Sequence, residues 1–293
     1  MRYQEGLETL FQNKTAIDPL EWLCLEKGST DISMRAVDIV TPIGKGQRGL
    51  IVSPPKAGKT TLLKQFAQTI AKISPATKIY CFLIDERPEE VTDFKRSVPG
   101  EVFASSSDRP HEEHIKLADF VMRKVASEAV AGQDVVLLLD SLTRLARVHN
   151  TNSQSGRTMS GGLDSRTMEI PRRFFGAARN LEGGGSLTIL ATILVDTGSR
   201  MDEIIFQEFK GTGNMELVLS RPAAENRLFP AINVAKSGTR KEEKLLPPET
   251  LQGVWKLRRA LSSLPDLEAT RKLIDLLKEN PTNASLLKSL ALD

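Results

Sequence analysis

Short apolar runs recur along the chain between residues 36 and 235 and are separated by longer polar or amphipathic stretches. Most of them lack the strict alternation of apolar and polar positions that marks a sheet with one solvated face, so both of their faces are expected to be buried. This pattern predicts an α/β fold with a mainly parallel central sheet flanked by helices. The predicted strands are AVDIV (36–40), GLIV (49–52), KIYCFLI (78–84), EVFA (101–104), VVLLLD (135–140), LTILATILV (187–195), MELVLS (215–220) and AINVA (231–235).

Helix starts are indicated by proline at first-turn positions and by small polar residues before amphipathic stretches. The expected starts lie near Lys59, Pro88, Pro110, Ser141 and Ser165.

The chain divides into three expected parts. Residues 1–34 are polar and mixed, which is typical of a lead-in or linker segment, and residues 35–247 form the α/β core. Residues 248–293 are helical throughout, with amphipathic segments at 249–264, 267–280 and 283–290. Their leucines recur at helical spacing, so a C-terminal helical subdomain packed on the core is expected.

Composition limits the class of protein. The 293 residues are 40% hydrophobic and 26% charged, and 40 Lys and Arg against 37 Asp and Glu leave a net charge of +3. A basic binding surface must therefore be local. Cys24 and Cys81 are far apart and lack metal-ligand spacing, which favours reduced thiols. No apolar run approaches the roughly 18 residues that span a bilayer, and the N-terminus lacks a signal-peptide pattern. A cytoplasmic protein is expected.

The segment SPPKAGKT (53–60) follows a predicted strand and precedes a predicted helix. A nucleotide-binding loop of the pattern G-x-x-x-x-G-K-[ST] would use Lys59 to contact the β- and γ-phosphates and Thr60 to ligate Mg²⁺. Gly58 would permit close approach of the backbone. Ser53 departs from the pattern, because glycine usually holds that position. The alternative is a chance Gly-Lys-Thr at a helix start.

Carboxylates follow two other predicted strands. Asp140 is the last residue of the predicted strand 135–140, and Asp85 and Glu86 come directly after the predicted strand 78–84. Ligands of open α/β sheets bind at the carboxyl ends of the strands, so Asp140 could hold the Mg²⁺ shell and Glu86 could polarise the attacking water. The alternatives are a turn residue for Asp140 and a helix-leading acid for Glu86.

Arginines are concentrated in residues 141–183, where seven of them face three acids. A Gly/Ser/Asn-rich loop (150–162) carries Arg157, and a second loop (196–203) carries Arg200. Two cationic loops leaving one sheet suit binding of a phosphate backbone. The alternative is a pair of surface loops whose charges only keep the protein soluble. Arg240 in SGTRKEE (237–243) could stabilise γ-phosphate charge across a subunit boundary; the alternative is an exposed loop arginine.

Together these segments closely resemble the ATPase domain of the Rho family of bacterial transcription termination factors. The resemblance runs from about Gly28 to Pro265 and is carried by PIGKGQRGLIVSPPKAGKT, LIDERPEEV, LLDSLTRLARVHN, RRFFGAARN, GGSLTILATILVDTGSRMDEIIFQEFKGTGNMEL and LFPAINVAKSGTRKEE. It implies a RecA-like P-loop NTPase that forms a ring-shaped homo-hexamer and acts as an RNA-dependent ATPase and translocase. The implied partners are single-stranded RNA, RNA polymerase and elongation factors.

The resemblance also implies roles for individual residues. Glu86 is the catalytic acid with Arg87 beside it, Asp140 is the Mg²⁺-associated acid, and Arg240 is the finger given to a neighbouring subunit. The ATP-binding residues are Pro55, Lys56, Ala57, Gly58, Lys59, Thr60, Thr61, the adenine-stacking Phe229 and the nearby Arg227. The RNA-binding loop residues are Arg157, Thr158, Gly161, Gly162, Gly198, Ser199 and Arg200.

Some positions depart from the family pattern. The family commonly has lysine where this chain has Arg157, Arg200 and Asn226, so the grip on RNA and one inter-subunit contact could differ. The family's N-terminal RNA-binding domain with an OB-fold is expected to be missing, because the chain starts at the linker that would follow it. Two rival readings are a catalytically idle RNA-binding ring subunit and a subunit of a rotary or export ATPase. The latter would be expected to have an N-terminal β-barrel and a glycine-richer phosphate loop.

Overall fold

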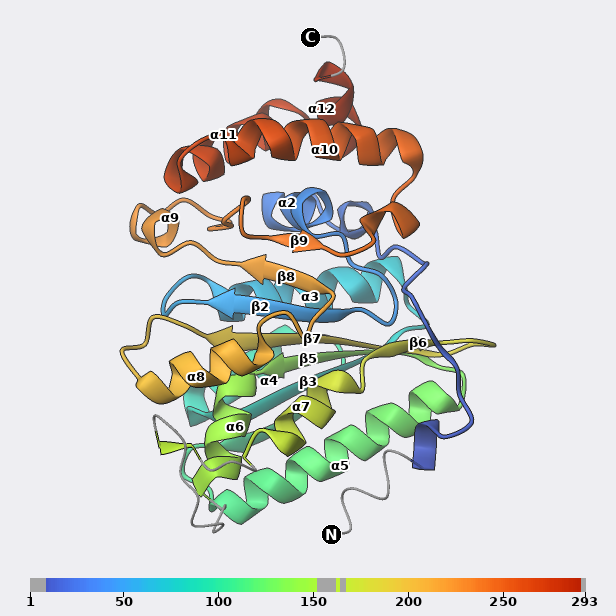
Figure 1. Cartoon of the computed structure of the whole chain (residues 1–293), viewed down its shortest axis with the longest axis vertical. Helices are drawn as coiled ribbons and strands as arrows, with labels where there is room; N and C mark the ends of the chain where they lie inside the picture. Colours follow the sequence, from blue (N-terminus) through green and yellow to red (C-terminus); the bar gives the residue numbers. More distant parts are fainter. Residues whose placement is uncertain (1–8, 152–161, 164–166, 291–293) are drawn as a thin grey trace.

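The computed structural model describes residues 9–151, 162–163 and 167–290 (Figure 1). Its centre is one sheet in the order β4-β3-β5-β7-β2-β8-β9, with β1 and β6 paired at the side of β7. The strands from β4 to β8 run parallel, so their carboxyl ends share one edge. They are β2 (Arg48–Ser53), β3 (Lys78–Glu86), β4 (Glu101–Ser106), β5 (Asp134–Asp140), β7 (Ser186–Leu194) and β8 (Met215–Val218). The short antiparallel strands are β1 (Ala16–Ile17), β6 (Arg179–Leu181) and β9 (Gly238–Thr239).

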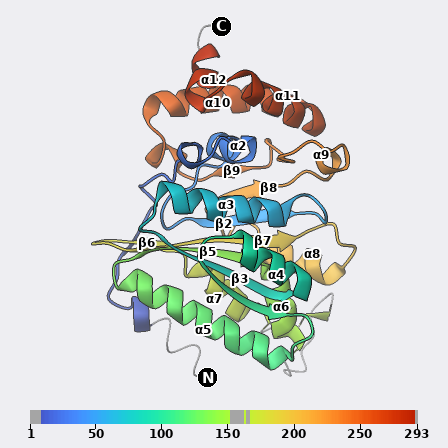
Figure 2. The same cartoon turned by 180° about the vertical axis from the view of Figure 1, so that it is seen from behind.

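Both faces of the sheet are covered, as the continuous apolar strands predict. Along β5, Val136 and Leu138 enter one hydrophobic core, whereas Leu137 and Leu139 enter the other. The first core receives α3 (Lys59–Ile73) and α4 (Pro88–Ser97), which lie on the near side of the sheet in Figure 2. The second core receives α5 (His111–Val130), α6 (Leu142–Thr151), α7 (Glu169–Gly176) and α8 (Arg200–Phe209).

The C-terminal helices α10 (Pro248–Ser262), α11 (Asp266–Glu279) and α12 (Asn283–Ser289) lie above α2 (Ile32–Val40) in Figure 1. They share the first core with it rather than forming a separate one. The buried guanidinium of Arg35 donates to Leu277 O at 2.8 Å and to Asn283 Oδ1 at 3.2 Å, which ties α2 to α11 and α12. Leu23 and Leu25, the latter in the 3₁₀ turn η1 (Leu25–Gly28), are also buried there, so the segment before Arg35 is packed into the core.

Two of the predicted strands are wrong. Residues 36–40 belong to α2, whose first turn is capped by Asp31 Oδ1 accepting from Ser33 N at 2.7 Å. The apolar run is short, and the charged residues of this helix, Arg35 and Asp38, are themselves buried, so no exposed polar face marks a helical period. Residues 231–235 make only an isolated bridge between Ile232 and Leu219, since the Asn233 side chain turns the backbone by accepting from Lys236 N.

The predicted helix starts at Lys59 and Pro88 are confirmed, and α5 and α6 begin one residue after Pro110 and Ser141. The helix expected near Ser165 begins at Glu169, while Ser165 itself lies outside the described residues. The connecting elements near the later part of the core are α9 (Arg221–Glu225) and the 3₁₀ turn η3 (Glu242–Lys244). Within the part of the chain that is described, no helix is long and apolar enough to cross a membrane.

Candidate functional site

The phosphate loop joins β2 to α3 and explains why serine is tolerated at its first position. Ser53 is the last residue of β2, is fully buried, and donates from Oγ to Pro54 O at 2.9 Å. The backbone enters the left-handed region at Lys56 (φ 64°) and Gly58 (φ 91°), not at Ser53. The freedom of glycine is therefore needed at Gly58, which directly precedes α3, where the helix N-terminus can receive an anion.

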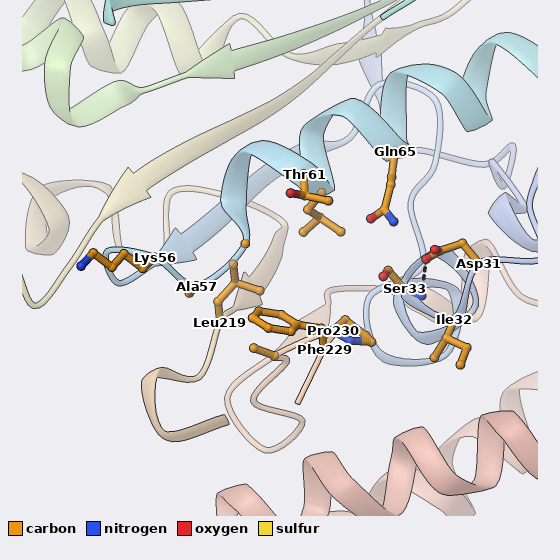
Figure 3. A pocket seen from close by; sticks show the side chains of 13 residues that line it. Asp31, Ile32, Ser33, Lys56, Ala57, Thr61, Gln65, Leu219, Phe229 and Pro230 are labelled. Atoms are coloured by element: carbon orange, nitrogen blue, oxygen red, sulfur yellow. Dashed lines mark hydrogen bonds between the residues drawn. The ribbon is translucent and has the colours of Figure 1, made fainter. Parts of the chain in front are cut away.

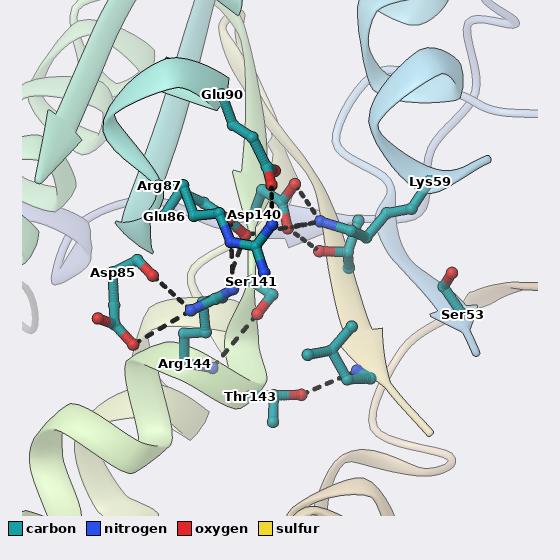
Figure 4. Close-up of polar contacts among 12 residues, drawn as sticks. Ser53, Lys59, Asp85, Glu86, Arg87, Glu90, Asp140, Ser141, Thr143 and Arg144 are labelled. Atoms are coloured by element: carbon teal, nitrogen blue, oxygen red, sulfur yellow. Dashed lines mark hydrogen bonds and ion pairs between the residues drawn. The ribbon is translucent and has the colours of Figure 1, made fainter. Parts of the chain in front are cut away.

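Lys59 and two strand-end carboxylates form the centre of the candidate site (Figure 4). Lys59 Nζ donates to both carboxylate oxygens of Asp140 and lies 3.8 Å from Glu86 Oε1. Asp140 ends β5 and pairs in register with Leu83 of the adjacent β3, which ends at Glu86. Thr192 Oγ1 on β7 also donates to Asp140 Oδ1 at 2.9 Å. Three neighbouring strands and the phosphate loop therefore meet at this point.

Glu86 is buried, with 3% of its surface exposed. Burial, followed by the charge of Asp140, raises the pKa of Glu86 from its ordinary value of 4.5 to about 7, although Lys59 and Arg144 act in the opposite direction. A carboxyl group with this pKa can exchange a proton near neutral pH, which is the property required of a general base.

Arg144 is a site residue that sequence reasoning counted only among the arginines of residues 141–183. Its Nε lies 3.1 Å from Glu86 Oε1, and its Nη1 donates to Asp85 O and lies 3.2 Å from Asp85 Oδ2. Asp85 itself has a positive φ of 55°. Arg144 is four residues after Asp140 in the first turn of α6, so its side chain can return to the same sheet edge. That spacing was the available signal.

Arg87 lies at the mouth of this centre. It is the N-cap residue of α4, its side chain is 71% exposed, and its Nη1 is 3.9 Å from Glu90 Oε1. Exposure leaves its guanidinium available to an incoming group, and Figure 4 shows it next to Glu86.

A pocket of about 480 Å³ opens beside the phosphate loop (Figure 3). Phe229, which is 44% exposed, forms one wall, and its ring lies 3.5 Å from the position that a Cβ on Gly58 would take. The predicted loop residues Lys56, Ala57, Gly58 and Thr61 line the pocket, together with Leu62 and Gln65 of α3. An exposed aromatic ring over a phosphate-loop helix suits stacking of a nucleotide base.

The same pocket includes residues that the sequence did not single out. Asp31, Ile32 and Ser33, at the start of α2, close its far side. The segment that was expected to be a lead-in therefore contributes to the site. Arg227 is exposed with φ 57° and is not among the lining residues.

The donor set near the phosphate loop fits Mg²⁺ that arrives with a nucleotide. Asp140 supplies one carboxylate, and Thr60, the second residue of α3, supplies a hydroxyl. Among the described residues there is no cluster of three or more His, Cys, Asp or Glu that could hold a metal alone. Mg²⁺ commonly uses one or two carboxylates and completes its shell with phosphate oxygens and water.

The two predicted RNA-binding loops come together where they are described. Arg157, Thr158 and Gly161 lie outside the described residues. A Cβ on Gly162 would lie 3.8 Å from Met201 Cε, next to exposed Arg200 of the second loop. Gly198 has φ 77°, and Ser199 caps α8 by accepting from Asp202 N. A hollow of about 610 Å³ is lined by this second loop and by Arg221.

The other arginines of residues 141–183 that the structure describes each contact a group within the protein. Arg147 Nε donates to Asp202 Oδ1 at 2.8 Å, Arg172 pairs with Glu208, and Arg173 pairs with Glu169 at 3.0 Å. Arg179 lies over the ring of Phe11 at 4.1 Å from its centroid.

Arg240 lies away from the phosphate loop. It follows β9, and its backbone N donates to Asn214 O just before the start of β8. Arg240 therefore lies at the amino ends of the parallel strands, whereas the phosphate loop lies at their carboxyl ends, beyond the six residues of β2. At about 3.3 Å per residue the two ends of β2 are roughly 17 Å apart. Arg240 therefore cannot serve the phosphate loop of its own copy.

Comparison with known proteins connects this geometry to a family. Residues 33–239 match the ATP synthase alpha/beta family, nucleotide-binding domain. The chain is 51% identical to the transcription termination factor Rho of Pseudomonas aeruginosa over 285 residues, which cover 96% of this chain and 68% of that protein. The chain belongs to the Rho family. It is 53% identical to Rho of Haemophilus influenzae and 55% identical to Rho of Micrococcus luteus, spanning 66% and 39% of those proteins.

Two solved structures share the fold. One, described as a prototypical ATPase from the type III secretion system of pathogenic bacteria, has a TM-score of 0.74 at 23% identity, over 89% of this chain and 83% of that one. The other, the assembled ATPase EscN of enteropathogenic E. coli, has a TM-score of 0.73 at 22% identity, over 94% and 71%. The RecA-like P-loop fold expected for a Rho-family chain is confirmed.

Proposed function

We propose that this chain is an RNA-dependent ATPase that assembles into a ring, most simply a homo-hexamer, and draws single-stranded RNA through its centre. The observation that carries the proposal is Glu86, a buried carboxyl group with a pKa of about 7 between Lys59 and Arg144 and next to the phosphate loop. The setting is cytoplasmic transcription, with RNA polymerase and its elongation factors as further partners.

Each residue of the site would have a separate role in the hydrolysis of ATP. The phosphate loop and Lys59 would hold the β- and γ-phosphates, and Phe229 would stack on the base. Glu86 would orient a water molecule and accept its proton while the water oxygen bonds to the γ-phosphorus. The bond to the β–γ bridging oxygen breaks, and ADP and phosphate leave. Mg²⁺, held by Thr60 and Asp140, would neutralise phosphate charge.

The dependence on RNA is supported by α6, which reaches both sites. Arg144 on this helix contacts Glu86, and Arg147, one turn later, pairs with Asp202. Thr197 Oγ1 in the second loop donates to Asp202 Oδ2 at 2.6 Å. A shift of this loop on binding RNA would therefore move the helix that positions Arg144.

An assembled ring is supported by Arg240, which lies at the edge of the sheet opposite the phosphate loop. A group that acts on ATP from that edge must act on the nucleotide of another copy. Repeating this contact head to tail closes a ring when the rotation permits.

The test is ATP turnover with Mg²⁺ at increasing single-stranded RNA, beside sedimentation of the same samples. We expect RNA to raise turnover, and a flat response would refute the translocase. Lys59→Ala should abolish turnover, whereas Glu90→Gln, on an exposed carboxylate of the same edge, should retain it. Turnover by Lys59→Ala would refute the assignment of the site. Rings without turnover by the unmodified chain would instead indicate a catalytically idle subunit.

A further inference from the structure

Arg48 and Arg240 are anchored to the same turn between α8 and β8. Arg48 Nε donates to Thr212 O at 2.6 Å, and Arg240 Nη2 donates to the preceding carbonyl, Gly211 O, at 3.2 Å. Asn214 holds both backbones, because its Oδ1 accepts from Arg48 N and its carbonyl accepts from Arg240 N, each at 2.8 Å. The turn at residues 211–214 therefore holds two guanidinium groups from distant segments of the chain next to each other.

Neither guanidinium has a carboxylate partner in the described part of the chain. Glu216, close to the same turn, is used by accepting from Gly211 N at 3.0 Å. Three lysines near this end of the sheet are paired instead, Lys45 with Glu21 and Asp134 and both Lys241 and Lys244 with Asp18. The two arginines, unlike these three lysines, are held by backbone carbonyls and not by carboxylates.

The arrangement places like charges close together. Burial, followed by the charge of Arg240, lowers the pKa of Arg48. The charge of Arg48 in turn adds to burial in lowering the pKa of Arg179, whose Nε donates to Ala177 O at 3.0 Å. Clustered cations repel one another unless an anion neutralises them, and paired guanidinium forks match phosphate oxygens.

The location of the pair limits which anion it can meet. Arg48 begins β2 and Arg240 follows β9, so both lie at the amino ends of the parallel strands, opposite the phosphate loop. The roughly 17 Å length of β2 separates them from the nucleotide of their own copy. The anion must therefore come from outside this chain.

We propose that Arg48 joins Arg240 in a two-guanidinium site for the terminal phosphate of a nucleotide held by the phosphate loop of a second copy of this chain. This inference rests on the proposed function. Arg48 is partly buried and its guanidinium bond is short, at 2.6 Å, so it supplies fixed charge. Arg240 is exposed and its guanidinium bond is longer, at 3.2 Å, so its side chain would advance to the phosphate more readily. The pair places more positive charge at the developing phosphate charge than one arginine can.

The variant that tests Arg48 is Arg48→Gln, because the glutamine amide can still donate to Thr212 O while the charge is lost. We expect RNA-stimulated turnover to fall at least tenfold, toward the larger losses seen when a sole arginine finger is removed. Affinity for ADP should stay unchanged, whereas affinity for ADP with beryllium fluoride, which mimics the terminal phosphate, should fall. Arg179→Gln is the matched control and should change either affinity less than about twofold, since protein carbonyls and Phe11 already satisfy its guanidinium.

Mixed rings distinguish action across the boundary from action within one copy. Glu86→Gln copies mixed in equal amount with Arg48→Gln copies should regain turnover, because about a quarter of randomly formed boundaries would have both residues intact. No recovery would overturn the inference. Full turnover by Arg48→Gln alone, or a loss of RNA affinity without any effect on beryllium fluoride binding, would also overturn it. Failure of the unmodified chain to hydrolyse ATP would instead refute the proposed function.

Discussion

Replacing Glu86 with glutamine should stabilise the nucleotide-free protein while it removes activity. Glutamine resembles the protonated side chain, so the variant avoids the cost of holding a buried charge. The rise in the pKa of Glu86 from 4.5 to about 7 corresponds to about 3 kcal/mol at 1.36 kcal/mol for each unit of pKa. The attraction of Lys59 and Arg144 for the carboxylate is already included in this pKa, so the expected gain is about 3 kcal/mol.

The difference in free energy of unfolding between Glu86→Gln and the unmodified chain should depend on pH. A carboxyl group whose pKa is raised by folding stabilises the folded state below its unfolded pKa, near 4.5, and that contribution is lost as pH rises through 7. The free energy of unfolding of Glu86→Gln should therefore match that of the unmodified chain near pH 4.5. It should exceed that of the unmodified chain by about 3 kcal/mol at pH 8.

Denaturant unfolding followed by fluorescence of Trp22 and Trp255 measures this difference at each pH. Glu90→Gln is the control, because the Glu90 side chain is 41% exposed and its distance to Arg87, 3.9 Å, is long for an ion pair. Its free energy of unfolding should stay within about 0.5 kcal/mol of that of the unmodified chain at every pH. A difference for Glu86→Gln that is independent of pH, or that favours the unmodified chain at pH 8, would refute the burial argument. Turnover should fall about 10²–10⁴-fold, the usual contribution of a general base.

Two further predictions concern the base pocket and the loop contact. Phe229→Ala should weaken ATP binding by about 1–3 kcal/mol and Phe229→Tyr should leave it nearly unchanged, because a phenol still stacks; equal losses in a fluorescent-nucleotide titration would contradict stacking. Asp202→Asn should reduce the stimulation of ATP turnover by RNA more than turnover without RNA, because it weakens the Arg147 pair and the Thr197 contact; an equal reduction of both rates would argue against coupling through α6.

The sequence predicts the parts of the fold that depend on local chemistry. The apolar strands, the phosphate loop and the carboxylates at strand ends are each visible in a short segment, and the parallel sheet then brings Lys59, Glu86 and Asp140 to one edge. The contacts that depend on distant segments are not visible. Arg144 entered only the charge balance of residues 141–183, because its partners, Asp85 and Glu86, belong to a different strand.

The error at residues 36–40 has the same origin. Asp38 is a charged residue type in the middle of an apolar run, yet it is buried because it accepts from Leu25 N at 3.0 Å and from Glu26 N at 2.7 Å. Because these bonds allow the carboxylate to be buried, Asp38 does not contribute to an exposed polar face, which is the feature that usually reveals a helix. The closure of the base pocket by Asp31 and Ser33 was hidden by the same folding of the N-terminal segment onto α3.

The polarity of the sheet explains why one copy contains two incomplete sites. Parallel strands place Lys59, Glu86 and Asp140 at their carboxyl ends, while Arg48 and Arg240 lie at the amino ends about 17 Å away. Each set is held by its own bonds, Lys59 to Asp140 and the two arginines to residues 211–214. In a lone copy Lys59 remains bound to Asp140, and the arginine pair has no carboxylate partner in the described part of the chain. A nucleotide in the phosphate loop would draw Lys59 of its own copy toward phosphate, and its terminal phosphate would neutralise the arginine pair of a neighbouring copy. The same contact therefore favours assembly when nucleotide is bound, and ring formation should strengthen with ATP more than with ADP.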